Sequence, residues 1–406
     1  MNMDRQVIEK ALSKPSPYGP DIDLSRYRLG KPEIGEVNEL DIDPRLNETL
    51  NRVGFRNVNR LSYIQVNESA KYRIMEEYLR KYGVRIIPLR KALDEIDFAR
   101  KLSWNLIRPD LDKYTAATYL YGGEIGYFIY VPPNVKVPIP IYTCLAITSD
   151  EKIQFAHNIV YVDEGAEAHL VTGCAVPHGI RDGLHIGISE FYVGRNARLT
   201  FSMIHAWSEK LHVRPRTSVN VEEGGEYVSY YIIYSPVASI QTYPMVRVSR
   251  DGKAYLANIV AASGNGIYDI GSKVQLFGNN SSAEIVSRVV ARGKSKTYAR
   301  SAIEAYTSNT KGHIECLGLL LSENAQISSI PVITSKKPGA LLSHEAAIGV
   351  IAEKELEYLM SRGFTEEEAR AILIRGFMSI DVPGIPRSIK IEVNRILDLV
   401  TKFAVG

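Results

Sequence analysis

The sequence predicts a mainly β fold in which short strands stack as the coils of a solenoid between two helical ends. Short runs of β-branched and aromatic residues fill the region from about residue 127 to about residue 332. Within this region a turn unit recurs at a spacing of about 30 residues. On either side of it, apolar residues recur every three to four positions, which is typical of helices.

Length, charge and cysteine content limit the class of protein. With 406 residues, 45% of them hydrophobic, the chain is long enough for two or three domains with a buried core. A formal net charge of +3 gives no basic footprint for a nucleic acid. No run approaches the roughly 20 apolar residues of a membrane span, and the first residues have no apolar signal core. Three widely spaced cysteines fit neither a disulfide framework nor a CxxC metal site, so we expect a soluble cytoplasmic protein.

Residues 1–115 predict an N-terminal domain of mixed, partly helical structure. Apolar and charged residues alternate at helical spacing over residues 69–83, with Gly83 placed as a helix-ending glycine. A second helical stretch is predicted over residues 89–106. Proline and glycine residues punctuate the start of the chain and predict an irregular arm that packs on another part of the protein: Pro15, Pro17, Gly19 and Pro20.

Residues 116–340 predict the solenoid itself. In the repeated unit, a Gly, Asn or Ser turn is followed by a polar or small residue and then by an apolar one. The units start 31, 28, 28, 30 and 42 residues apart, at Gly165, Asn196, Gly224, Gly252, Ser282 and Asn324. Each coil leaves its apolar face half-buried until a neighbour stacks on it, so the unit must repeat. The longer last interval predicts an insertion or partial coil around Gly293.

Residues 341–406 predict a C-terminal helical domain. One helix presents Leu356, Leu359 and Met360 on a common face and ends at Gly363. Thr365 and Glu368 form a capping box for the next helix, whose inward residues are predicted to be Ala369, Ile372 and Leu373. A last helix has an apolar stripe that either covers the end of the solenoid or docks a partner: Ile389, Val393, Ile396, Leu397, Val400 and Phe403.

Several segments resemble one protein family. His344-Glu345-Ala346 precedes a helix containing Tyr358-Leu359-Met360-Ser361-Arg362-Gly363. Upstream lie a Gly-Gly-led strand at residues 122–135 and the segments Asp163-Glu164-Gly165-Ala166, Thr172-Gly173-Cys174-Ala175-Val176-Pro177 and Asp182-Gly183-Leu184-His185. Together they resemble the SufB/SufD family of scaffold subunits in the Suf machinery for iron-sulfur cluster assembly, with a middle that is closer to SufB. The resemblance implies a right-handed parallel β-helix between helical terminal domains.

The resemblance also implies a function and partners. Such proteins are non-catalytic scaffolds, and an ABC-type ATPase, SufC, grips their C-terminal helices and hydrolyses ATP. A transient iron-sulfur cluster forms where two scaffold subunits pair. We therefore expect this chain to dimerise near residues 324–333, either with itself or with a SufB/SufD paralogue, and to bind no nucleotide itself. The residues leave open which of the two scaffold roles it takes.

The resemblance points to His344 and Glu345 as candidate iron or cluster ligands. Imidazole nitrogen and carboxylate oxygen are acceptable ligands for ferrous iron. On residue chemistry alone, the pair could instead cap the start of a helix after Ser343. The family's cysteine late in the β-helix does not carry over, since Ala325 is expected in its place by spacing from the segment 330–333. This departure favours a partner-scaffold role.

The remaining candidates have a structural alternative of similar or greater weight. Cys316 lies in an alternating run that places it on one face of a strand, where a buried free cysteine is the common outcome. Cys174 follows a turn glycine and could relay sulfur or simply fill space. His185, near Asp182 and His178, could be a metal ligand or a hydrogen-bonding loop residue. Cys144 has no charged neighbour to lower its pKa, so an inert thiol is expected.

A second class of function stays open at this point. Parallel β-helices also serve as polysaccharide lyases or hydrolases, which would need clustered carboxylates or calcium ligands on one sheet. The segment Gly264-Asn265-Gly266 lacks the strand–loop–helix context of a dinucleotide site, and the sequence has no P-loop motif.

Overall fold

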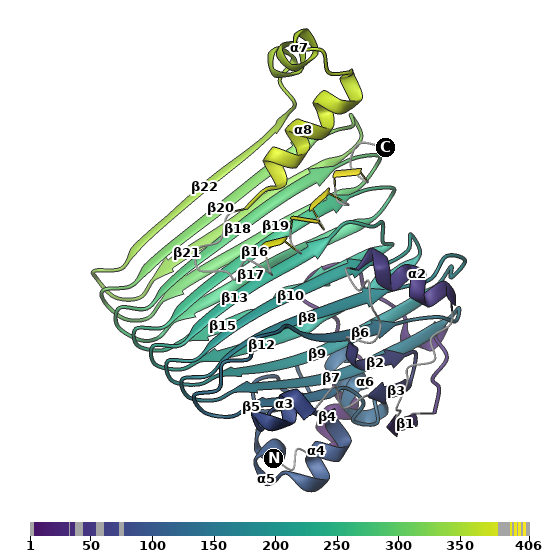
Figure 1. Cartoon of the computed structure of the whole chain (residues 1–406), viewed down its shortest axis with the longest axis vertical. Helices are drawn as coiled ribbons and strands as arrows, with labels where there is room; N and C mark the ends of the chain where they lie inside the picture. The colour runs from purple at the N-terminus through teal and green to yellow at the C-terminus, as the bar shows by residue number, and fades with distance from the viewer. Residues whose placement is uncertain are drawn as a thin grey trace.

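The computed structural model describes residues 4–31, 33–36, 44–53, 61–72, 77–380, 390–391, 394–395, 397–398 and 401–402. These residues form a β-solenoid of about eight turns with helices at both ends, so the predicted fold class is confirmed (Figure 1). The coils stack from the N-terminal helices at the bottom of Figure 1 to α7 and α8 at its top. The sheet continues through residue 350, ten residues beyond the expected start of the C-terminal helical domain.

Two sheets form the walls of the solenoid, and nearly all their strand pairs are parallel. The first sheet runs in the order β1 (Glu33–Glu36), β3 (Ser69–Tyr72), β2 (Leu61–Val66), β6 (Ile141–Ala146), β8 (Glu167–Ala175), β10 (Arg198–Ala206), β13 (Glu226–Ile233), β16 (Lys253–Ala262), β18 (Ser282–Ala291), β20 (Lys311–Leu320) and β22 (Leu341–Val350). The second contains β4 (Arg85–Pro88), β5 (Tyr127–Val131), β7 (Lys152–Val162), β9 (Gly183–Val193), β11 (Leu211–Val213), β12 (Arg216–Val221), β14 (Ser239–Thr242), β15 (Met245–Val248), β17 (Ile267–Leu276), β19 (Lys296–Ala305) and β21 (Gln326–Ser335).

The strand register confirms the period and corrects one detail. Lys253 pairs with Ser282, Ser282 with Lys311, and Lys311 with Leu341, so one coil takes 29 or 30 residues. The predicted insertion around Gly293 is wrong. The earlier turn units precede strands of the first sheet, whereas the unit at Asn324 precedes β21 of the second sheet. The interval of 42 residues therefore compares turns on different sheets.

The core follows from the two-residue alternation of the strands. One face of each strand points into the lumen, where apolar side chains stack coil on coil, as Ile285 and Ile314 do with no exposed surface. On the outer face of the first sheet, α2 (Pro44–Arg52) and α8 (Glu366–Met378) cover a second apolar cluster. The outer face of the second sheet is covered by the N-terminal helices.

The N-terminal region is less helical than predicted at one place. Residues 69–72 form β3, which pairs with β2, so a strand replaces the first part of the predicted helix; only α3 (Glu77–Lys81) remains, followed by Gly83 at a positive φ of 72°. The helical stretch over 89–106 is confirmed as α4 (Leu89–Glu95) and α5 (Asp97–Leu102). The other helices of this region are α1 (Arg5–Ala11), the short 3-10 helix η1 (Leu24–Arg26) and α6 (Lys113–Tyr121).

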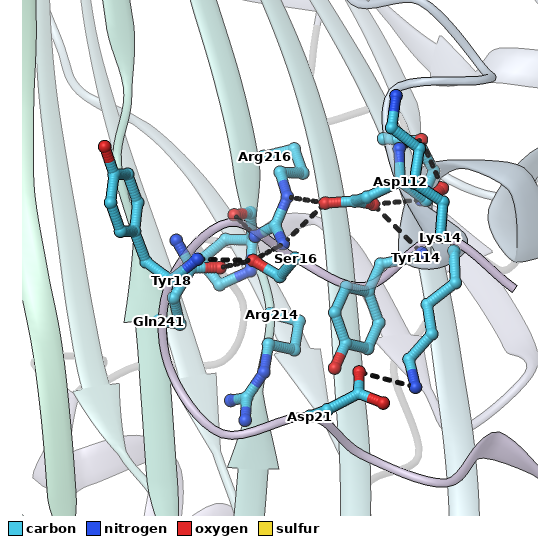
Figure 2. Close-up of polar contacts among 12 residues, drawn as sticks. Lys14, Ser16, Tyr18, Asp21, Asp112, Tyr114, Arg214, Arg216 and Gln241 are labelled. Carbon is cyan, nitrogen blue, oxygen red and sulfur yellow. Dashed lines mark hydrogen bonds and ion pairs between the residues drawn. The ribbon is translucent and has the colours of Figure 1, made fainter. Parts of the chain in front are cut away.

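The predicted arm packs across the second sheet, and a polar cluster holds it there (Figure 2). Asp112 caps α6 and also accepts a hydrogen bond of 2.8 Å from Nε of Arg216. Arg216 donates in turn to the Ser16 hydroxyl of the arm. Arg214, which has no exposed surface, donates to the Pro20 carbonyl and to the hydroxyl of Ser239. Buried guanidinium groups thus tie the arm, α6 and the sheet together.

The C-terminal helices agree with the sequence in their limits but only partly in their faces. In α7 (Glu353–Ser361) no residue is buried, and the helix projects beyond the last coil (Figure 1). The Thr365–Glu368 capping box of α8 is confirmed. Ala369 is buried as predicted, but Ile372 is exposed, and Ile374 and Met378 face the sheet instead. Of the predicted last stripe only Leu397 lies among the described residues, where it is buried; the other five lie outside them.

Replacing Asp112 by Ala should lower the free energy of unfolding by about 3 kcal/mol, since it removes a helix cap and leaves the nearly buried Arg216 without its carboxylate. Urea unfolding followed by circular dichroism measures this. Asp110→Ala is the matched control, because its partner Arg108 is largely exposed and the pair contributes below about 1 kcal/mol. Equal losses in the two variants would contradict the assigned role of Asp112.

Candidate functional site

The C-terminal end of the solenoid is uncovered in the part of the chain that the structure describes. There β22 pairs with β20 and β21 with β19, each on one side only. Apolar side chains on these two strands are exposed to an unusual degree, namely Val332, Ile333, Leu341, Ile348 and Val350. An exposed strand edge beside exposed apolar residues is a template for pairing with another chain.

His344 and Glu345 lie in this last coil, within strand β22 and not at a helix entry. The alternative that they cap a helix is therefore wrong. Consecutive residues of a strand point to opposite faces. His344 is in register with Ile314, which faces the lumen, whereas Glu345 is in register with Glu315 on the outer face. Both residues are exposed, and they reach their surroundings from opposite sides of the strand.

Cys316 is the thiol that the fold brings to His344. It pairs with Ala346, two residues after His344, and it faces the lumen as His344 does. Strand geometry places the Cα atoms of the two residues roughly 8 Å apart. Cys316 is only 2% exposed, and its Sγ atom lies 3.7 Å from the hydroxyl of Ser301. The lumen at the open end therefore carries a thiol and an imidazole on adjacent strands.

The spacing in the sequence contains the signal for this pair. One coil of about 30 residues after Cys316 leads to Ala346, so the repeat itself places Cys316 beside the His344-Glu345-Ala346 segment. Ala325, in contrast, lies in the turn after β20, at the end where Leu320 pairs with Val350. His344 lies six residues before Val350, roughly 20 Å along the strand. Within one chain, a side chain at position 325 would not reach His344.

Charged residues surround Glu345 on the outer face. Its register partner Glu315 forms an ion pair with Arg288 of β18. His313, on the same face, shares a hydrogen bond of 2.9 Å with the hydroxyl of Ser343. Glu345 itself has no ion-pair partner among the described residues. It is therefore the carboxylate of this row that is free to contact a second chain.

The other two cysteines lie deep in the structure, several coils from the open end. Cys174 lies in the lumen, with its Sγ atom 3.5 Å from Sδ of Met203, and Cys144 lies under the outer helices. Burial raises the pKa of both thiols, so neither is readily ionised in this conformation. For Cys144 this agrees with the expected inert thiol. A sulfur-relay role for Cys174 stays a prediction.

His185 is also buried, at 2% exposure, on strand β9. Its Nδ1 atom lies 2.8 Å from Oε1 of Gln154, and burial lowers its pKa to about 3. The ring is therefore neutral near pH 7 and bonded within the protein. No group of three or more His, Cys, Asp or Glu side chains with metal-site geometry occurs among the described residues, and none of their helices is long and apolar enough to cross a membrane.

Comparisons with known proteins agree with the geometry of the solenoid. Residues 145–377, more than half of the chain, match the SufBD core domain of the SUF system for FeS cluster assembly. An iron-sulfur cluster assembly SufBD family protein of Methanothermobacter thermautotrophicus is 38% identical over 405 residues, covering 97% of each chain. Family proteins of Archaeoglobus fulgidus (39% identity, 90% of this chain and 97% of the other) and Pyrococcus horikoshii (30% identity, 91% and 85%) are also similar.

Proposed function

The chain belongs to the SufBD family of iron-sulfur cluster assembly proteins, and from this premise we propose that it is a non-catalytic scaffold subunit on which a cluster is assembled. The observation that carries the proposal is the placement of Cys316 and His344 on one face of the lumen at the uncovered end of the solenoid. Family membership favours this function over the alternative of a polysaccharide lyase or hydrolase.

The chemistry of the two residues suits a cluster that is held briefly and then passed on. Thiolate is the preferred ligand of sulfur-bridged iron, and neutral imidazole can replace it on some iron atoms. One chain offers these two ligands at the open end, and Glu345 offers a third on the other side of the strand. Four-coordinate iron atoms in a cluster need more ligands than that. The cluster is thus cargo that needs a second subunit to complete its site.

We propose that the second subunit pairs through the exposed edges of β21 and β22. Adding strands across these edges would satisfy their backbone groups and bury the exposed apolar residues of the last coil. It would also bring a second set of His344, Glu345 and Cys316 positions to the junction. The partner is either another copy of this chain or a SufB/SufD paralogue.

We further propose that α7 and α8 dock the SufC-type ATPase. The two helices form a hairpin that extends past the last coil and carries exposed apolar side chains at Tyr358, Met360, Phe364 and Ile372. Monomeric surfaces rarely gather such residues on one small element unless a partner covers them. Deleting the chain after Gly363 would remove α8 and uncover the sheet, since Ile374 and Met378 pack there, so point substitutions on α7 are the cleaner test.

Replacing Cys316 by Ala should abolish cluster loading, and His344→Ala should reduce it severalfold, because each removes a ligand from the lumenal face. Iron and sulfide content with visible absorption after anaerobic reconstitution measures loading, for the isolated chain and for its complex with a cysteine-bearing paralogue. Cys144→Ala is the matched control, because this thiol is equally buried but lies far from the open end. Full loading of the Cys316 variant in both settings would show that the ligands lie elsewhere.

The wild-type chain should be a dimer at micromolar concentration, and the double substitution Val332→Lys with Ile348→Lys should make it monomeric. The added charges would face each other or an apolar surface in the pairing of the last coils. Analytical ultracentrifugation gives the mass. Leu29→Lys, an equally drastic change at an exposed position near the other end, should leave the dimer intact. A wild-type monomer, or a dimer insensitive to the double change, would exclude this interface.

Replacing Tyr358 and Met360 by Ala should weaken capture of the ATPase at least tenfold, since truncated apolar anchors typically cost about 1 to 2 kcal/mol each. Titration calorimetry with the purified ATPase measures the dissociation constant. The thermal unfolding midpoint should not change, because both side chains are exposed. Lys354→Ala on the same helix serves as control. Unchanged affinity in the double variant would place the docking surface away from α7.

A further inference from the structure

A cleft of about 500 Å³ lies near the N-terminal end of the solenoid, far from the uncovered coil. Its walls come from α4 and α5 on one side and from the end of α6 on the other. Its floor is His157 of β7, which is buried between the apolar cluster under α4 and α5 and the one under α6. Neither the cluster site nor the proposed docking helices use this cleft.

The histidine at the floor is held by a buried carboxylate. Nε2 of His157 lies 2.8 Å from Oε2 of Glu190, which has no exposed surface. Glu190 also accepts hydrogen bonds from the backbone N–H groups of Trp104, Leu106 and Ile107, at 2.6 to 3.1 Å. A carboxylate with this many donors is ionised, so Nε2 carries the proton that points to it. Nδ1 is left with a lone pair, and it has no hydrogen-bond partner among the described residues.

The loop that wraps around Glu190 is strained. Trp104 has a φ of +56°, a left-handed conformation that is unfavourable for a bulky side chain. Glu124, on the opposite wall, has a φ of +58°. The strain at Trp104 places its ring 4.4 Å from His157 and 5.4 Å from Tyr119, measured between ring centroids. Strain of this kind persists where the surrounding structure holds it, and it is concentrated at ligand sites.

The lining of the cleft is rich in acceptors and negative charge. The carboxylates of Asp94 and Glu124 lie at the rim. The C-terminal end of α6, with the negative end of its dipole, reaches the cleft at Tyr119 and Gly122. Arg100 is the cation among the described lining residues, and its guanidinium is already bonded to the carbonyl groups of Leu93 and Asp94. An anion would find little here to bind it.

We propose that this cleft binds a small organic ammonium group. The aromatic faces of Trp104 and Tyr119 attract a cation, the rim carboxylates neutralise it, and Nδ1 of His157 accepts one of its N–H groups. The chemistry fits either a free polyamine or the side chain of a lysine presented by a partner protein. It requires no part of the cluster-assembly function, so either proposal can fail alone.

Titration calorimetry on the full chain tests the site with putrescine, spermidine and a lysine-containing peptide, each at constant ionic strength. Saturable binding of an amine is expected, and whichever probe binds more tightly identifies the source of the ammonium group. Tetramethylammonium, which has no N–H to donate to His157, should bind at least severalfold more weakly than putrescine. Inorganic phosphate should not bind.

The double substitution Asp94→Asn with Glu124→Gln should weaken amine binding at least tenfold. Glu95→Gln, at an exposed position of α4 outside the cleft lining, is the matched control and should have no effect. His157→Asn should remove the preference for putrescine over tetramethylammonium, and circular dichroism checks that this variant folds. Absence of amine binding at millimolar concentration, or binding that is equal in the double variant and the control, would overturn the proposal.

Discussion

The structure depends on one constraint: a coil of parallel strands can bury its backbone edges only against the next coil. Register between neighbouring coils is continuous over whole strands, as in the pairing of β16, β18, β20 and β22. Each added coil satisfies the edge of the previous one and exposes its own. The chain must therefore deal with two ends, and it treats them differently.

At the N-terminal end the chain closes its own edge. β3 turns back against β2, and β4 pairs with β5, in both cases antiparallel, so the stacking direction ends there. The arm and α6 then cover the outer face through Arg214, Arg216 and Asp112 (Figure 2). Such buried ionic contacts add less stability than apolar packing would, but they specify one position for a segment with little apolar surface.

At the C-terminal end no such closure is present among the described residues, and the functional candidates lie there. His344, Glu345 and Cys316 lie within two neighbouring strands whose next neighbour would belong to another chain. An iron-sulfur cluster is bound by few ligands per subunit and must leave again, so an incomplete site at an open edge suits assembly better than an enclosed pocket would. The same open edge accounts for the exposure of apolar residues that a single chain would otherwise bury.

The sequence alone determined the solenoid, its period and its helical ends, because strand alternation and turn spacing are local patterns that repeat. The same patterns identified the His344-Glu345 segment through its resemblance to a family. They did not show that the two residues face opposite sides of one strand, because a helix entry was equally compatible with the letters. They also placed the expected cysteine position at Ala325, although the period already linked Cys316 to Ala346. Only the tertiary structure decided this, since contact between residues 30 positions apart depends on the register of the coils. The cleft over His157 likewise assembles from α4, α5, α6 and β7, which no local pattern relates to one another.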